Sequence, residues 1–185
     1  LATSGDAVSF ATAVTVAGGD LGIDATNSGS AIGGGLIQFS NTQSGGGNQV
    51  SLNAGTGGDV TLVGAASGIS NFAVTNSDDI SLTSLTTTGS VSMTGQGTAT
   101  LSTALSSGGA VTLAVNDFNL PGTISAGTNA VQIRPATTTR SVVHGAPRGR
   151  LDPAHAQRII GITDAGDNGL IALRACQAYV RAITR

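Results

Sequence analysis

The sequence predicts an all-β fold in which short strands stack as successive turns of a parallel β-solenoid. Three observations support this fold class. Residues 1–133 contain no Lys, Arg, Glu or His and are rich in Gly, Ser, Thr and Asn. They carry short triplets of apolar, polar and apolar residues, and several of these triplets recur at an interval of about 20 residues. All eight arginines lie in residues 134–185, where the triplets stop.

The triplets predict strands that have one buried face. They begin at Val8, Val14, Leu21, Ile37, Val50, Val60, Phe72, Ile80, Val91, Val111, Phe118 and Val131. Because side chains alternate across a strand, we expect the middle residue of each triplet to face solvent and its two neighbours to fill the interior. Gly and Asn between the triplets supply the positive φ angles that tight corners need.

The spacing of the triplets distinguishes a solenoid from other all-β folds. The step from Val91 to Val111 equals the step from Val111 to Val131, and Val60 and Ile80 are separated by the same interval. A repeat of this length, about 20 residues, fits one solenoid turn, and successive turns stack at about 4.8 Å. An antiparallel sandwich is the alternative, but it predicts longer alternating strands and more aromatic residues. We expect the Gly- and Ser-rich segments 27–35 and 44–47 to project as loops from one corner of the early turns.

The chain divides into a solenoid body over residues 1–133, a linker over 134–150 and an Arg-rich helical tail or cap over 151–185. Asp152 and Pro153 predict a helix start, and residues 169–184 predict a second helix with an arginine stripe that includes Arg174, Arg181 and Arg185. Such a tail suits a cap for the solenoid end, and a helix lying on a membrane surface is the alternative. No stretch approaches the roughly 18 apolar residues of a membrane-spanning helix.

The beginning of the chain and its single cysteine set further limits. Residue 1 is Leu and no signal peptide precedes it, so we expect a processed product or an excised piece. Cys176 is the only cysteine, which excludes an intrachain disulfide. The arginines are not interleaved with aromatic residues in a recognisable motif, so nucleic-acid binding is not predicted.

Candidate chemistry is sparse. Asp78-Asp79 and His144-Gly145 superficially match part of a polysaccharide hydrolase site, and a polysaccharide-active β-helix enzyme is the alternative function. The companion carboxylate motif and a basic substrate clamp are missing, and aspartates before a strand also simply form turns. No cysteine and histidine cluster has zinc spacing. We therefore predict no enzyme, no catalytic residue, no cofactor and no metal site.

A Thr-rich stretch offers a minor alternative. Threonines are frequent between Thr83 and Thr103, and flat threonine arrays on a solenoid can bind ice. Such a surface needs the same Thr-x-Thr position in successive turns, and the sequence does not align these residues in that way.

Three segments, 89–94, 108–113 and 122–127, resemble the repeats of filamentous-haemagglutinin-like exoproteins of the two-partner secretion type. Residues 151–159 are also similar to a helical insertion found between such repeats, with His155 in place of a glutamate and Pro153 intruding. The resemblance covers roughly residues 5–133 and lacks the family's secretion domain. It implies a right-handed parallel β-helix at a bacterial cell surface and carries over no catalytic residue.

These observations predict a structural or adhesive extracellular protein that binds through extended surfaces. The partner is expected to be a second copy, added head-to-tail into a filament, or a host or matrix surface. The N-terminus begins almost at once with a strand-like triplet and shows no obvious cap. Val8 and Phe10 at this edge, with Arg174, Arg181 and Arg185 in the tail, are the predicted interaction residues.

Overall fold

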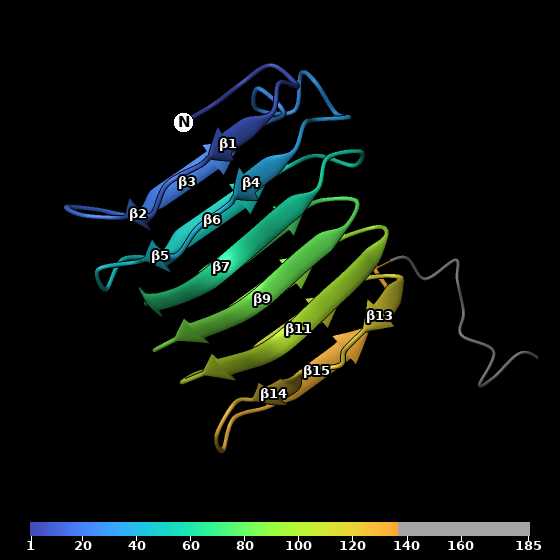
Figure 1. Cartoon of the computed structure of the whole chain (residues 1–185). Coiled ribbons are helices and arrows are strands. Elements are labelled where there is room, and N and C mark those ends of the chain that lie inside the picture. Colours follow the sequence, from blue (N-terminus) through green and yellow to red (C-terminus); the bar gives the residue numbers. More distant parts are fainter. Residues whose placement is uncertain (137–185) are drawn as a thin grey trace, which may run out of the picture. The chain divides into compact units, whose positions relative to one another are not determined.

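The computed structural model describes residues 1–136 as a parallel β-solenoid (Figure 1). All pairing between its strands is parallel, and it runs between segments in successive turns rather than between sequence neighbours. The strands are β1 Val8–Phe10, β2 Val14–Thr15, β3 Leu21–Asp24, β4 Ile37–Phe39, β5 Gln43–Ser44, β6 Val50–Asn53, β7 Val60–Ile69, β8 Phe72–Asn76, β9 Ile80–Thr87, β10 Val91–Thr94, β11 Thr98–Ser107, β12 Val111–Ala114, β13 Asp117–Asn119, β14 Thr123–Ser125 and β15 Val131–Arg134.

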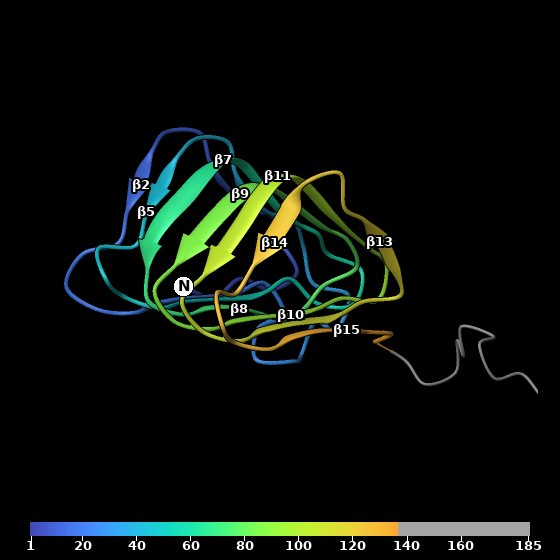
Figure 2. The same cartoon turned by 90° about the horizontal axis from the view of Figure 1, so that it is seen from below.

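Each turn contributes to three faces, which the end-on view shows closing around the interior (Figure 2). Face 1 contains β1, β4, the first parts of β7, β9 and β11, and β13. Face 2 contains β2, β5, the second parts of β7, β9 and β11, and β14. Face 3 contains β3, β6, β8, β10, β12 and β15. Each face is therefore built from one strand segment per turn.

The expected repeat is confirmed in the later turns. Val91 pairs with Val111 and Val111 pairs with Val131, so the equal sequence steps between these residues are turns of the solenoid. The earlier turns are longer. Leu21 pairs with Val50, and Val50 pairs with Phe72, and both steps exceed the step from Val91 to Val111. The excess of the first step includes the loop between β3 and β4, and that of the second includes register shifts within β7. The strands nevertheless keep the same faces.

The core forms as the triplets predict. All twelve triplets coincide with strands or overlap them, and from β4 to β12 their flanking residues are buried while the middle residue is more exposed. Phe72, Ile80, Leu82 and Leu113 are among the largest side chains that the interior encloses almost completely. The last turn differs, since Val131 and Ile133 are 43% and 47% exposed. The interior is thus a single apolar column that follows the solenoid axis.

The two early loops lie at different corners, so the expectation of one shared corner was wrong. Residues 27–35 lie between β3 and β4, where face 3 turns into face 1. Residues 45–47 lie between β5 and β6, where face 2 turns into face 3. Gly34 and Gly46 have φ angles of 63° and 57°, which the left-handed turns at both corners require.

The predicted linker and tail fall almost entirely outside the described residues. Arg134, expected to open the linker, is the last residue of β15. The helix expected to start at Asp152 and Pro153 and the helix expected over 169–184 lie outside residues 1–136, as do Arg174, Arg181 and Arg185.

Candidate functional site

The outer surface of face 2 consists of rows of small side chains. One row runs through the pairs Thr15 with Ser44 and Ser44 with Ser67. It resumes after a register shift with Thr86 beside Ser106, and then Ser125. Their hydroxyl groups donate and accept hydrogen bonds but do not act as acids or bases near neutral pH. This surface can bind a partner by contact and hydrogen bonding.

A second row beside it is smaller still. Ala65 pairs with Ser84, which pairs with Ala104, and Ala104 pairs with Thr123. Long side chains are therefore missing from both rows over these turns. A partner can approach the strands of face 2 closely along the length of the solenoid.

The threonines singled out by the sequence do not form a repeated array. Thr86 lies beside Ser106, and Thr100 lies between Ser81 and Asn119. Thr87 is only 5% exposed, and its hydroxyl donates to the carbonyl of Gly89 at 2.9 Å. The Thr-x-Thr repetition that the ice-binding alternative needs is therefore not found among these positions.

Asp79 has a structural use at the corner before face 1. The Asp59 carboxylate accepts the backbone N–H of Asp79 at 3.1 Å, and the Asp79 carboxylate accepts that of Thr98 at 2.6 Å. Each bond joins one turn to the next. The same device recurs before face 3, where the Asn71 side chain accepts the N–H of Ser90 at 2.9 Å. These carboxylates therefore act as turn-to-turn connectors.

Residues 1–136 contain no group of three or more His, Cys, Asp or Glu side chains arranged to hold a metal ion. His144, the proposed companion of Asp78 and Asp79 in the enzyme alternative, lies outside the described part of the chain. The structure therefore brings no histidine to the aspartates within this range.

Asp24 organises the loop that follows β3. Its Oδ1 atom accepts the hydroxyl of Thr26 at 2.6 Å and the backbone N–H of Thr26 at 2.8 Å. Its Oδ2 atom accepts the N–H of Ser28 at 3.0 Å, and the Asn53 amide from the next turn donates to Oδ1 at 3.2 Å. The hydrogen bond from the Thr26 hydroxyl is the main cause that lowers the pKa of Asp24.

The predicted edge residues Val8 and Phe10 lie on β1, the first strand of face 1. Val8 is 7% exposed, so its side chain belongs to the core. Phe10 is half-buried and stacks on Phe39 of the next turn, with ring centroids 4.8 Å apart. What these residues leave open is the backbone edge of β1, which pairs with β4 alone among the described strands.

The N-terminal end is partly covered, contrary to the expectation of no cap. The N–H of Thr3 donates to the carbonyl of Asp24 at 2.8 Å, and that of Asp24 donates to the carbonyl of Leu1 at 2.9 Å. The N–H of Gly5 donates to the carbonyl of Ala25 at 2.9 Å. Residues 1–5 therefore run along the outer edge of β3, and we call them the edge guard. Its two bridges, Ala2 with Asp24 and Ser4 with Thr26, do not reach the edges of β1 and β2.

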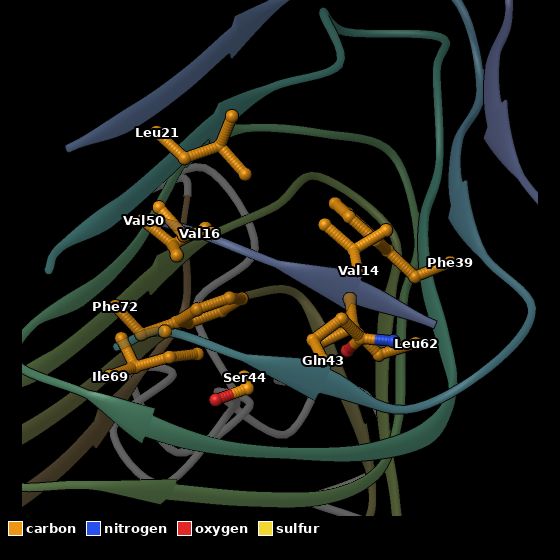
Figure 3. Close-up of a pocket in the computed structure, with 11 residues that line it drawn as sticks. Val14, Val16, Leu21, Phe39, Gln43, Ser44, Val50, Leu62, Ile69 and Phe72 are labelled. Atoms are coloured by element: carbon orange, nitrogen blue, oxygen red, sulfur yellow. The ribbon is translucent and has the colours of Figure 1, made fainter. Parts of the chain in front are cut away.

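A small pocket lies inside the first turns and is lined mainly by apolar side chains (Figure 3). Gln43 of β5 projects into it near Val14 and Leu62. Gln43 is 7% exposed, and its Oε1 atom has no hydrogen-bond partner among the described residues. Its Nε2 atom donates to the backbone carbonyl of Asn41. The pocket is part of the core and holds one unsatisfied amide oxygen.

Comparison with known proteins finds no matching family model, no matching curated protein and no matching solved structure. The likeness to filamentous-haemagglutinin repeats therefore gains support only at the level of the solenoid fold. Within residues 1–136, the chain forms no helix long and apolar enough to cross a membrane.

Sequence reasoning missed three features of the described chain: the face 2 rows, the edge guard and the buried, unsatisfied Gln43. The rows carry a usable signal, because Ser84 and Ala104, like Thr86 and Ser106, are one repeat apart. The edge guard has no apolar triplet. Gln43 belongs to a two-residue strand, which is too short for a periodic pattern.

Proposed function

We propose that this chain is a structural or adhesive repeat protein of a bacterial cell surface, working outside the cell as a right-handed β-helix. The observation that carries the proposal is the surface of the solenoid. Small uncharged side chains line its face 2 in rows. Among the described strands, the outer edges of β1 at one end and of β13, β14 and β15 at the other have no strand partner. Such a surface suits extended contact with a matrix, a host surface or another copy.

The charge distribution supports the same function. Residues 1–136 carry seven aspartates and one arginine, and contain no His, Lys or Glu. General acid–base chemistry needs a group that titrates near the working pH, most often histidine. Of the two aspartates considered for a polysaccharide-active enzyme, Asp79 has its carboxylate engaged by the backbone N–H of Thr98 from the next turn.

The test is a binding and assembly assay on the purified chain. Binding to immobilised matrix polysaccharide or matrix protein, or fibres seen by negative-stain electron microscopy, is the expected result. Cleavage of an acidic polysaccharide that is lost in Asp78→Asn and Asp79→Asn variants would overturn the proposal in favour of an enzyme. A chain that neither binds a surface nor assembles would also count against it.

A further inference from the structure

At the N-terminal end of the solenoid, the outer backbone edge of β1 has no strand partner among residues 1–136. The N–H of Val8 donates to the carbonyl of Leu36 at 2.8 Å, and the N–H of Ser40 donates to the carbonyl of Phe10 at 2.9 Å. Val8 and Phe10 therefore direct their backbone groups towards β4. Because the direction alternates along a parallel strand, Ser9 directs its N–H and C=O outwards. An unpaired edge of this kind is a template for another strand.

The C-terminal end of the described solenoid is complementary to it. In the last turn, the inward-facing side chains, including Phe118, Ile124 and Val131, are half-buried or exposed. The side chains at the equivalent positions of the turns before it are buried. One further turn in the same register would cover those of the last turn. The first turn of a second copy has an apolar residue at each matching position: Val8 continues the row of Phe118, Val14 that of Ile124, Leu21 that of Val131 and Ile23 that of Ile133.

Charge favours head-to-tail contact over contact between two N-terminal ends. Arg134 follows Ile133 on face 3 as Asp24 follows Ile23, so a second copy in register would place Asp24 beside Arg134. Arg134 is exposed and is the only Lys or Arg among residues 1–136. Two N-terminal ends facing each other would instead bring like charges together, since Asp20 and Asp24 lie in the first turn of each copy.

The edge guard occupies the place where the partner's β15 would pair with β3. Four hydrogen bonds of 2.8 to 2.9 Å hold it along β3 and Ala25: three join backbone groups at Leu1, Thr3 and Gly5, and one runs from the N-terminal amine of Leu1 to the carbonyl of Gly22. The guard buries little, since Leu1 is 67% exposed and residues 1–5 are exposed or half-buried. Segments with few buried apolar contacts open at low cost. The guard can therefore leave β3 while the rest of the solenoid stays folded.

We propose that the N-terminal edge of β1, β2 and β3 binds the β13, β14 and β15 edge of a second copy, and that the edge guard limits this addition by competing for β3. The proposal rests on the structural function above and specifies how copies would join. A heterologous contact of this kind does not close on itself and propagates into a filament one solenoid wide.

The first test compares the full chain with a variant that lacks residues 1–5. Light scattering over a concentration series measures the concentration at which assembly begins, and negative-stain electron microscopy measures the width of the product. We expect the deletion to lower this concentration by about tenfold, which corresponds to about 1.4 kcal/mol. An unchanged or higher onset would overturn the role of the guard, and discrete dimers in place of filaments would overturn head-to-tail addition.

The second test blocks the edge itself. Ser9→Pro removes the outward N–H of β1 without touching its bonds to β4, whereas Ser9→Ala keeps this N–H and is the matched control. We expect loss of filaments with proline and retention with alanine in the chain lacking residues 1–5. Filaments that persist with proline would overturn the proposal.

A third variant keeps the proposal testable if Ser9→Pro fails to fold. Arg134→Glu places a negative charge opposite Asp24, so we expect the concentration at which assembly begins to rise. Added salt screens the repulsion and should bring this concentration partly back down. If the variant and the chain with Arg134 begin to assemble at the same concentration, the predicted register is contradicted. A chain that stays monomeric but still binds matrix surfaces would overturn this inference alone and leave the proposed adhesive function standing.

Discussion

Replacing Gln43 with leucine should stabilise the solenoid, because the unsatisfied Oε1 atom of Gln43 lies in an apolar interior. The ladder position of Gln43 continues through Ala66 to Leu85 and Leu105, so the fold already accepts leucine there. The substitution removes a buried polar atom that pairs with nothing among residues 1–136. It supplies an apolar side chain of the kind found in later turns at the same position.

The size of the effect follows from two opposing contributions. An unsatisfied buried polar group costs about 1–3 kcal/mol, and its removal recovers this energy. The bond from Gln43 Nε2 to the Asn41 carbonyl is lost, at about 0.5–1.5 kcal/mol, but Asn41 is exposed and water can replace the donor. We expect a net stabilisation of about 1.5 kcal/mol. With a urea dependence of about 1–3 kcal/mol per M, the unfolding midpoint should rise by roughly 0.5–1.5 M.

Urea unfolding followed by circular dichroism measures this shift. Ser44→Ala is the matched control, since Ser44 is the exposed neighbour of Gln43 on the same strand and should change stability by less than about 0.5 kcal/mol. A lower midpoint for Gln43→Leu would refute the reasoning, because it would mean that the amide has a favourable partner in the folded protein.

Two further predictions concern the early loops. Gly34→Ala should lower the free energy of unfolding in urea by about 2–5 kcal/mol, because the φ of Gly34 is 63° and a Cβ there would overlap the Ala54 carbonyl. Gly18→Ala is the matched control: its φ is 82° but the space around it is open, so it should cost only about 1–2 kcal/mol. Equal costs for the two variants would contradict the overlap. The hydrogen bond from Thr26 lowers the folded pKa of Asp24 below its ordinary value of 3.8, so its stabilisation is complete above that pH and is lost as the pH falls through the folded pKa. The free energy of unfolding should therefore fall less between about pH 6 and pH 3 in the Asp24→Asn variant than in the unchanged chain. An identical fall in both proteins would contradict this stabilising role of Asp24.

The periodic part of the fold could be predicted from the sequence. Alternating triplets mark strands whenever one side is buried, and Val91, Val111 and Val131 pair at the interval that their sequence numbers predict. Both signals come from the apolar column, because every turn must place similar side chains on the same rows. The identity of the residues and the register of the strands are therefore two aspects of the same packing.

The remaining features lack such a signal. In the turns of β9 and β11, face 2 buries one apolar residue each, Leu85 and Leu105, so no triplet reveals this face there. The two early loops could be recognised by their glycines, but assigning each to a corner requires the strand pairing. The edge guard is held by backbone hydrogen bonds at Thr3 and Gly5, and backbone groups are the same in every residue. Edge contacts of this kind leave no pattern in the side chains.

The unequal lengths of the turns have a consequence for how this scaffold can vary. The first turn on face 3, from Leu21 to Val50, is longer than the later turn from Val91 to Val111, yet both deliver their strands to the same rows. The additional residues are accommodated at the corners, outside the hydrogen-bonded stack. The number of residues in a turn can therefore change at a corner without altering the stack of hydrogen-bonded strands. The corners are where such a chain can acquire or exchange recognition sequences while its rod continues to be built in the same way.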